Sequence, residues 1–377
     1  MKYNKFRFDE ITLNYDKKRI PLSAMERTKR QGAFRYFGAQ GVIDYVDDYI
    51  FDGKYLLIAE DGENLKSKRQ NIAQIVEGKF WVNNHAHIVQ CNDKCILEYL
   101  AYLINGKDVS GYITGSAQPK LSQANLNAME FDIPSIKEQQ DILSILLPIE
   151  QKIRINKEIN NNLEQQAKAI FSNEFLTLET LPDGWKQASL IDIADYLNGL
   201  AMQKYRPTVD ETGIPVLKIK ELRQGCCDDN SELCSQNIKS EYIIHNGDVI
   251  FSWSGSLLVD FWCGSICGLN QHLFKVTSNK YDKWFYYAWT KHHLNRFIAV
   301  AADKATTMGH IKRDELSKAE VLIPNEADYK RIGALLQPIY DLIIANRIEN
   351  KKLAETRDTL LPKLMSGGID ISEVECE

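Results

Sequence analysis

The sequence contains no long hydrophobic run. None of its 377 residues lies in an apolar stretch of about 18 residues, so no membrane-spanning helix is expected. The N-terminal segment MKYNKFRFDE carries charged and aromatic residues where a signal peptide needs an apolar core. We therefore expect a cytoplasmic protein that makes no membrane contact.

The spacing of a zinc site is also missing. Two cysteine pairs, Cys91/Cys95 and Cys263/Cys267, are spaced C-x3-C, whereas zinc ribbons use C-x2-C pairs, and no H-x3-5-H segment follows. The eight cysteines are expected to be free thiols in a reducing compartment, with no metal site.

Catalytic motifs are equally scarce. No Asn-Pro-Pro-Tyr-like tetrapeptide or Gly-rich methyl-donor loop occurs, and Gly53-Lys54 lacks the surroundings of a phosphate loop. Asp61 and Glu63 have no third carboxylate at a spacing that suits a nuclease. His85 and His272 have no Ser, Cys or Asp partner in range, which favours a structural or phosphate-contact role. The sequence predicts a protein without catalytic activity of its own.

The bulk composition is that of an ordinary globular protein. Hydrophobic residues make up 44% and charged residues 26%, and the length suits two or three domains. The net charge of −5 does not favour nucleic-acid binding, but a binding groove depends on local clusters of charge rather than on the total.

An internal repeat organises the chain. Residues 132–171 align without gaps to residues 322–361, with ten identical positions in forty. Upstream, Val82–His85 matches Leu269–His272, and Tyr49–Gly53 matches Tyr242–Gly247. Because these matches occur in the same order, we interpret the chain as a tandem duplication of one domain followed by a helix.

This interpretation predicts four segments. They are a first globular domain (1–134), a central spacer helix (135–180), a second globular domain (181–324), and a C-terminal spacer helix with a tail (325–377). Pro182-Asp183-Gly184 is typical of a turn between the copies.

Each copy is expected to begin with a mixed α/β domain. Short apolar runs next to glycine or polar residues predict buried strands at 55–59, 87–89, 248–251 and 273–276. Dense apolar residues at 97–103 and 284–289 predict packed helices.

The end of each copy has the pattern of a coiled coil. Apolar or small residues recur at alternating steps of four and three, and the seam comprises Ile149, Ile153, Asn156, Asn160, Leu163, Ile339, Ile343, Asn346, Asn350 and Leu353, with Arg357 interrupting it. Asparagine occupies the same two seam positions in both copies, and a polar seam residue fixes register at a cost in stability. Alternatively these asparagines face solvent, since Ile159 and Ile348 offer a competing stripe.

A pseudo-twofold axis between the copies would make the two helices antiparallel. A helix of about 27 residues spans roughly 40 Å, which is close to one turn of B-DNA. The expected fold class is therefore mixed α/β (α+β) in two tandem recognition domains, separated by two long antiparallel coiled-coil helices with pseudo-twofold symmetry.

The most distinctive segment of the chain is the C-terminal tract Thr356–Ile371, and others are Gly115–Leu126 followed by Ile133-Pro134 and Glu138-Gln139, Leu181–Trp185, Tyr36–Tyr45 and Phe51–Gly62. These segments resemble one known family, the specificity subunits of type I restriction–modification enzymes. The chain departs from the family at Gly368, where an acidic residue is common, and at Tyr3, where the family has tryptophan. Met308 stands opposite Gln118, so this position is not expected to do the same job in both copies.

The resemblance implies a non-catalytic subunit that binds double-stranded DNA. Each recognition domain would read one half of a bipartite site, with a non-specific gap between the halves. The helices would set the gap and dock two modification subunits that carry S-adenosylmethionine, and restriction subunits would join them. Cofactors, including ATP and Mg²⁺, are expected on these partners and none on this chain. Alternatives are a non-catalytic scaffold, or a stand-alone DNA-binding regulator whose paired helices dock partners.

Candidate DNA contacts are Lys and Arg for phosphates, and amides, guanidiniums and hydroxyls for bases. In the first copy they are Lys17, Lys18, Arg19, Arg27, Lys29, Arg30, Arg35, Lys66, Lys68, Arg69, Gln118 and Lys120. In the second copy they are Lys204, Arg206, Lys218, Lys220, Arg223, Ser252, Ser254, Thr306, Thr307, His310, Lys312 and Arg313. Any single lysine among them could instead belong to an ordinary solvated surface.

Overall fold

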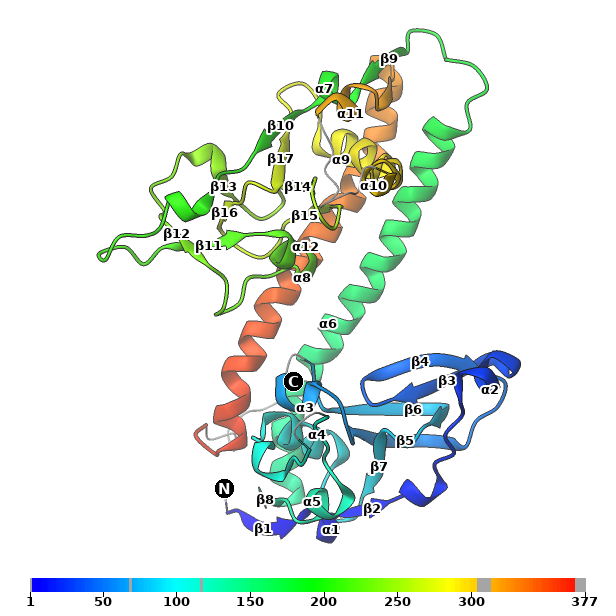
Figure 1. Cartoon of the computed structure of the whole chain (residues 1–377), viewed down its shortest axis with the longest axis vertical. Coiled ribbons are helices and arrows are strands. Elements are labelled where there is room, and N and C mark those ends of the chain that lie inside the picture. The colour runs from blue at the N-terminus through cyan, green and yellow to red at the C-terminus, as the bar shows by residue number, and fades with distance from the viewer. Residues whose placement is uncertain (1, 68–69, 116–117, 304–312, 370–377) are drawn as a thin grey trace. The chain divides into compact units, whose positions relative to one another are not determined.

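The computed structural model describes residues 2–67, 70–115, 118–303 and 313–369 of the chain. The chain divides into two compact units (Figure 1), one formed by Met1–Pro148 with Arg357–Glu377 and the other by Ile149–Thr356. Each unit contains one mixed α/β domain together with parts of two long helices.

A short antiparallel pair closes the first domain. Strand β1 (Asn4–Arg7) pairs with β8 (Glu130–Ile133), so that Asn4 lies opposite Ile133. The beginning and the end of the domain therefore meet at the point where the long helix starts.

The main sheet of the first domain has six strands in the order β2-β7-β5-β6-β3-β4. Their bounds are β2 Thr12–Asn14, β3 Gln31–Gly38, β4 Gly41–Val46, β5 Phe51–Ala59, β6 Ala73–Val82 and β7 Ala86–Cys91. The central strand β5 is buried along its last four residues, because neighbouring strands cover both of its edges. The helices are α1 Phe8–Ile11, α2 Ala24–Lys29, α3 Asn64–Ser67, α4 Leu97–Gly106 and α5 Gln123–Asn127, with a 3-10 turn η1 at Asp16–Lys18.

The second domain repeats this plan. Strand β9 (Lys186–Ser189) pairs with β18 (Glu320–Ile323) as β1 does with β8. A four-stranded sheet has the order β10-β17-β14-β15, and a second has the order β12-β11-β16-β13. Their bounds are β10 Asp195–Asn198, β11 Ile214–Leu217, β12 Leu233–Cys234, β13 Ile243–Ile244, β14 Val249–Ser252, β15 Leu258–Phe261, β16 Cys267–Leu269 and β17 Leu273–Thr277. The helices are α7 Leu190–Ile193, α8 Ile219–Gln224, α9 Lys283–His292, α10 Leu294–Asp303 and α11 Arg313–Ser317.

The predicted elements are confirmed at these positions. The four predicted strands fall within or overlap β5, β7, β14 and β17, and the two predicted helices lie in α4 and α9. The predicted turn before the second domain is present, because Gly184 has φ +78° and the Trp185 N–H donates to the Pro182 carbonyl.

The two strand pairs also explain the missing N-terminal tryptophan. Tyr3 directly precedes β1 as Trp185 directly precedes β9. The Tyr3 hydroxyl donates to the Met365 carbonyl at 3.1 Å, and the Trp185 indole donates to Asp328 at 3.0 Å. Each side chain thus ties the start of its domain to a long helix.

The long helices are α6 (Ile136–Phe171, 36 residues) and α12 (Glu326–Met365, 40 residues), both longer than the expected 27. Side-chain caps start them immediately after the domains. The N–H of Glu138 bonds to the Ser135 hydroxyl, and the N–H of Asp328 bonds to the Asn325 side chain. Such caps satisfy otherwise orphaned N–H groups, so each helix begins well before its seam.

Two asparagine layers join the helices inside the second unit. The amide of Asn156 donates to the side-chain oxygen of Asn350, and that of Asn346 donates to Asn160, both at 2.9 Å. Because the earlier residue of one helix meets the later residue of the other, the helices are antiparallel. Asn156 and Asn160 are buried and Ile159 is 38% exposed, so these asparagines lie between the helices rather than facing solvent, while Ile348 of the competing stripe is partly buried against the core.

Each long helix ends in a hydrophobic core. Near the end of α6, Ala167 and Phe171 belong to the core cluster of the second unit. In the last turns of α12, Leu364 belongs to the core cluster of the first unit and Leu360 packs against it. Burying such side chains stabilises a domain by about 1.5–3 kcal/mol each, so both helix ends are anchored.

Candidate nucleic-acid interface

In the first copy, several loops meet where the central strand β5 ends. The Nδ1 atom of His85 lies 2.6 Å from the Asp61 carboxylate, and the N–H of Glu60 donates to the His85 carbonyl at 2.9 Å. The buried side-chain oxygen of Asn83 accepts the N–H of His85 at 2.8 Å. We call Glu60, Asp61, Asn83 and His85 the first strand exit.

The second copy builds the same arrangement where β14 ends. The Nδ1 atom of His272 lies 3.1 Å from the Ser254 hydroxyl, and the N–H of Trp253 donates to the His272 carbonyl at 3.4 Å. The buried side-chain oxygen of Asn270 accepts the N–H of His272 at 3.2 Å. Trp253, Ser254, Asn270 and His272 form the second strand exit. The expectation that His85 and His272 have no Ser or Asp partner is therefore wrong, since Asp61 and Ser254 contact their rings.

Two candidate contacts lie next to the first strand exit. Lys120 forms a β-bridge with Asp61, and its ammonium lies 3.2 Å from the Glu60 carboxylate. The side chains of Gln118 and Lys120 are exposed. The structure thus brings an amide and a cation beside the end of β5.

The basic turn η1 divides into exposed and internal residues. Lys17 and Lys18 are exposed. Arg19 turns inward, with only 14% of its side chain accessible, and its guanidinium lies 2.7 Å from Glu60 and 3.4 Å from Asp16. Arg19 therefore stabilises the strand exit from within, which corrects the expectation that it is a DNA contact.

A buried ion pair fixes the position of this turn. Asp16 lies 2.6 Å from His87 Nδ1, and the Nε2–H of His87 donates to the Leu121 carbonyl at 2.9 Å. Burial by itself raises the Asp16 pKa, but the His87 hydrogen bond and charge outweigh it and hold this pKa below the ordinary 3.8. The pair links η1 and β7 to the segment that carries Lys120. The sequence offered no signal for it, since the two residues are 71 positions apart.

The arginines around α2 have partners within the domain. Arg27 lies 2.9 Å from Asp44, and Arg30 lies 2.8 Å from Asp47, with its guanidinium over the Trp81 ring. Arg35 donates to the Glu77 carbonyl, whereas the side chain of Lys29 is exposed. The Arg30–Asp47 pair is 32% and 50% exposed, and exposed ion pairs contribute about 1 kcal/mol or less, so a phosphate can compete for Arg30 more easily than for the more buried Arg27.

The basic residues of the second copy lie near carboxylates as well. Lys218 is 2.9 Å from Glu232, and Lys220 is 3.1 Å from Asp228. Arg206 is 3.8 Å from Glu232, at the edge of an ion-pair distance. The side chains of Lys204 and Arg223 are exposed.

Of the remaining basic candidates, two lie among the described residues. Lys66 is exposed on α3, and Arg313 donates to the Tyr196 carbonyl at 2.9 Å. Candidates outside the described residues are Lys68, Arg69, Thr306, Thr307, His310 and Lys312.

The two serine candidates are used inside the domain. Ser252 and Ser254 are 0% and 2% exposed. The Ser252 hydroxyl donates to the carbonyls of Ser254 and Ser256, and the Ser254 hydroxyl bonds to His272. We correct their expected role from base contact to support of the loop, because neither hydroxyl reaches the surface.

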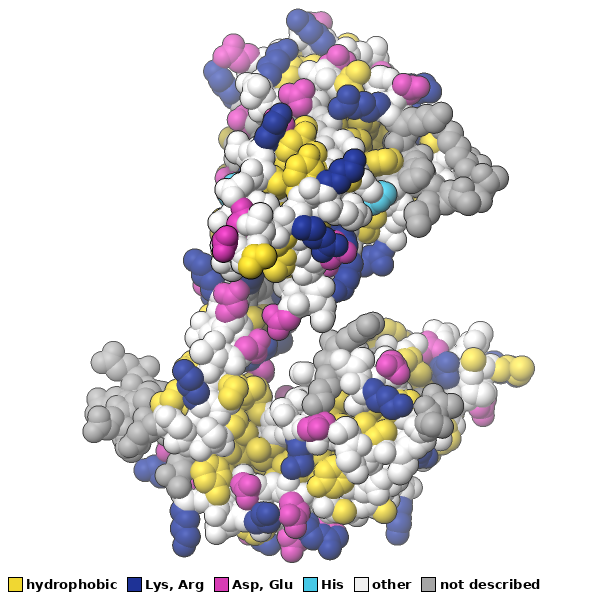
Figure 2. Space-filling model, turned by 60° about the vertical axis from the view of Figure 1, so that its left-hand side comes forward, with side chains coloured by type: hydrophobic (Ala, Val, Ile, Leu, Met, Phe, Trp, Pro, Cys, Tyr) yellow, Lys and Arg dark blue, Asp and Glu magenta, His cyan; other side chains and the backbone are white. Residues whose placement is uncertain are grey.

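Charge on the visible surface is mixed. Figure 2 shows Lys and Arg side chains scattered among Asp and Glu on the described part of that face. This agrees with the net charge of −5. Positive potential for DNA would therefore come from local segments such as η1 rather than from one broad basic face.

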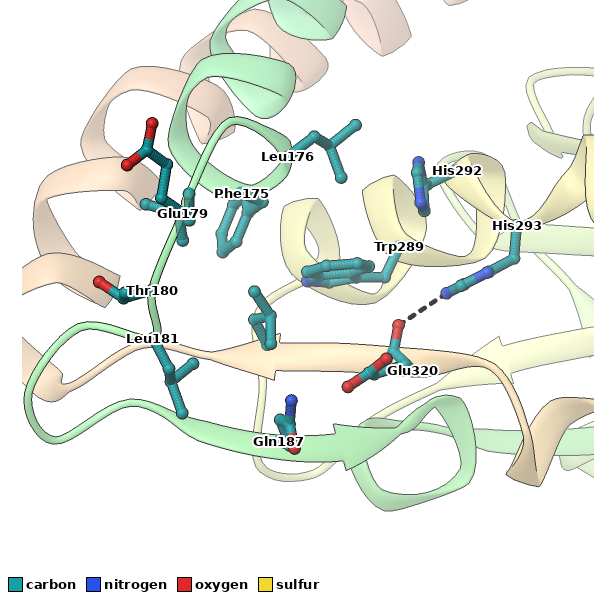
Figure 3. Close-up of a pocket in the computed structure, with 12 residues that line it drawn as sticks. Phe175, Leu176, Glu179, Thr180, Leu181, Gln187, Trp289, His292, His293 and Glu320 are labelled. Atoms are coloured by element: carbon teal, nitrogen blue, oxygen red, sulfur yellow. Dashed lines mark hydrogen bonds between the residues drawn. The ribbon is translucent and has the colours of Figure 1, made fainter.

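A cavity of about 430 Å³ in the second unit contains two histidines (Figure 3). Burial lowers the pKa of His293 to about 4, so its ring is neutral near pH 7 and donates from Nε2 to the Glu320 carbonyl at 2.7 Å. This contact ties α9 to β18. Among the described residues, no cluster of His, Cys, Asp and Glu could hold a metal ion, and no helix is long and apolar enough to cross a membrane.

Duplicated α/β domains, paired helices and matching strand exits define a protein of two tandem α/β domains joined by long helices. The chain matches the family described as type I restriction modification DNA specificity domain twice, over residues 2–165 and 182–355. The chain belongs to this family, whose specificity subunits are the non-catalytic components of type I restriction–modification systems. The resemblance seen in the sequence is thereby confirmed.

Two named relatives and one solved structure are similar to this chain. The chain is 27% identical over 311 residues to the type I restriction enzyme MjaIX specificity subunit of Methanocaldococcus jannaschii, covering 75% of the chain and 71% of that protein. It is 20% identical to the HindI specificity subunit of Haemophilus influenzae, covering 84% of each. The crystal structure of the type I restriction–modification S subunit from M. genitalium has the same fold, with a TM-score of 0.62, 13% identity, and coverage of 97% of this chain and 96% of that one.

Proposed function

We propose that each recognition domain reads one half of a bipartite DNA site, and that the paired helices set the gap between the halves and dock two modification subunits. The observation that carries this proposal is the repeated strand exit. Both copies hold the same backbone arrangement with Asn83 and His85 or Asn270 and His272. Different side chains, Glu60 and Trp253, stand at the same place beside it. The same backbone arrangement with different side chains suits two domains that read different DNA sequences.

The paired helices support the role of a fixed spacer. The asparagine layers allow one register, because sliding one helix past the other would place an asparagine amide against an apolar seam residue. We infer that a fixed register keeps the gap between the half-sites constant.

Docking of modification subunits follows from the duplication. The two helices carry the same seam in opposite directions, so the surface beside one helix recurs beside the other. Two such surfaces suit two copies of one partner. S-adenosylmethionine would be bound by these modification subunits, and ATP and Mg²⁺ by restriction subunits.

For phosphate contact we propose exposed cations of the two domains, of which Lys120 lies next to the first strand exit. The residues are Lys17, Lys18, Lys29, Lys66, Lys120, Lys204 and Arg223, with the paired Arg27, Arg30, Arg206, Lys218 and Lys220 as further contacts. Gln118 is the proposed base contact of the first copy among the sequence candidates.

Methylome sequencing tests the proposal. Cells that express the complete system should methylate one bipartite motif, and deletion of this chain alone should abolish that methylation. Unchanged methylation without the chain, or a motif with a single uninterrupted recognition block, would contradict the proposed role.

A further inference from the structure

The two strand exits share more than a motif. The last residue of the central strand lies opposite the first residue of the following partner strand in both copies, as Ala59 faces Ala86 and Ser252 faces Leu273. The residue just before that partner strand is a histidine in both copies. Its carbonyl accepts a backbone N–H from the residue after the central strand. The two frames therefore correspond residue by residue.

The contact of the histidine ring persists although its partner changes. Nδ1 meets a carboxylate in the first copy, at Asp61, and a hydroxyl in the second, at Ser254. A contact that survives such a change of chemistry has a geometric purpose. In both copies it joins the turn before the partner strand to the loop after the central strand.

The residue between the asparagine and the histidine is an amide in each copy, Asn84 or Gln271. Asn84 is exposed and Gln271 is partly exposed. In the first copy the Asn84 carbonyl lies 3.4 Å from the Arg19 guanidinium, and in the second the Gln271 amide lies 3.3 Å from His272. Both amides occupy the tip of a turn whose other two side chains are committed to internal contacts.

Primary amides suit one kind of DNA contact especially well. The side chain of Asn or Gln can accept a hydrogen bond from the adenine N6 amino group while donating one to adenine N7, in a bidentate contact in the major groove. Each of these turns therefore offers a short, firmly held segment with one adenine-compatible side chain.

We propose that Asn84 and Gln271 are base-reading residues of the two half-sites, and that His85 and His272 are the positioning residues that hold them. The inference rests on the proposed function and deepens it by naming one reader in each domain. The side chains beside the turns, such as Glu60 and Trp253, differ and would adapt each domain to its own sequence.

The test uses the complete system, with methylome sequencing of wild type and single variants. Asn84→Ala should relax one base position in one half-site, and Gln271→Ala should relax one position in the other half. The expected loss of discrimination at that position is on the order of tenfold or more. His85→Ala should relax the same half as Asn84→Ala, and His85→Asn, which keeps a donor near the Nδ1 position, should restore stringency. His272→Ala and His272→Asn should behave likewise for the other half.

His245→Ala is the matched control, because the contact of this histidine to Asp248 runs through its backbone nitrogen. It should leave the motif unchanged. If a histidine variant abolishes methylation by unfolding, which thermal melting of the purified chain would reveal, the exposed Asn84 and partly exposed Gln271 still decide the matter. For them, competition binding of the purified complex to duplexes with one motif base pair replaced at a time measures discrimination directly.

The outcomes distinguish the proposed function from the assignment of the reader residues. A wild-type system without a bipartite motif would overturn the proposed function. If the wild-type system methylates a bipartite motif but Asn84→Ala and Gln271→Ala both keep full stringency, only the assignment of the reader residues is overturned. The same holds if both variants relax the same half-site.

Discussion

The asparagine layer formed by Asn160 and Asn346 should contribute measurably to stability. The two side chains are 6% and 8% exposed, and the amide of Asn346 donates to Asn160 at 2.9 Å. Asn160 also donates to the Ile343 carbonyl at 3.2 Å. Replacing either residue with alanine leaves a buried polar group without its partner, which costs about 1–3 kcal/mol.

The double variant Asn160→Ala/Asn346→Ala should cost less than the sum of the single variants. Once both amides are gone, no orphaned group from this pair remains, so a coupling of about 0.5–3 kcal/mol is expected. Urea unfolding of the purified chain, followed by tryptophan fluorescence and circular dichroism, measures all three variants. Asn161→Ala, at an exposed position on the same helix, is the control and should change stability by less than about 0.5 kcal/mol.

Additive effects, with the double variant equal to the sum of the singles within about 0.5 kcal/mol, would refute the coupled layer. The other layer should couple less. The side-chain oxygen of Asn156 is buried without a hydrogen-bond partner among the described residues, so that layer already carries an unsatisfied group.

Three further results are expected. Replacing Lys17 and Lys18 with alanine should weaken DNA binding and reduce the slope of log K against log salt by about 1.8, at roughly 0.9 per phosphate contact. Neutralising Lys66, Lys68 and Arg69 should also reduce this slope, and an unchanged slope would remove either group from the interface. Asp16→Asn should lower the stability of the protein near pH 7. This loss should shrink as the pH falls below the ordinary carboxyl pKa of 3.8 and through the lowered pKa of Asp16, because Asp16 of the wild type then becomes protonated as well. Thermal melting at several pH values measures the difference, and a loss that stays constant would contradict this reasoning. The stability contribution of neutral His293 should be complete above pH 6.5 and decline towards pH 4, by at most about 3 kcal/mol, because the histidine of the unfolded chain takes up a proton first. The melting temperature of His293→Gln should therefore depend less on pH between 6.5 and 4 than that of the wild type, and an equal dependence would contradict the assignment.

The helices and the duplication could be predicted because their signals are local or repeated. The steps of four and three depend only on helix geometry, and the second copy confirmed the first at Asn156 and Asn346. The predicted spacer segments begin at residues 135 and 325, one residue before α6 and α12, where the caps at Ser135 and Asn325 lie. The expected helix length of about 27 residues was too short, since both caps lie outside the periodic seam.

The candidate interface was predictable only in part. Lys17, Lys18 and Arg19 are one basic run in the sequence, but Arg19 turns to Glu60, a residue that sheet pairing brings near it. Ser252 follows a strand in the sequence, yet it is buried because β14 lies between β15 and β17. Which side of a strand or turn faces solvent depends on sheet register, and residue spacing does not encode it.

The reciprocal anchoring of the long helices links the folding of the two domains. A helix that starts beside one domain ends in the core of the other, so neither core is complete without a segment from the opposite half of the sequence. We expect a destabilising change in one core to loosen the helix end anchored there, and with it the asparagine layers between the helices. Damage to one domain should therefore lower the stability of the other.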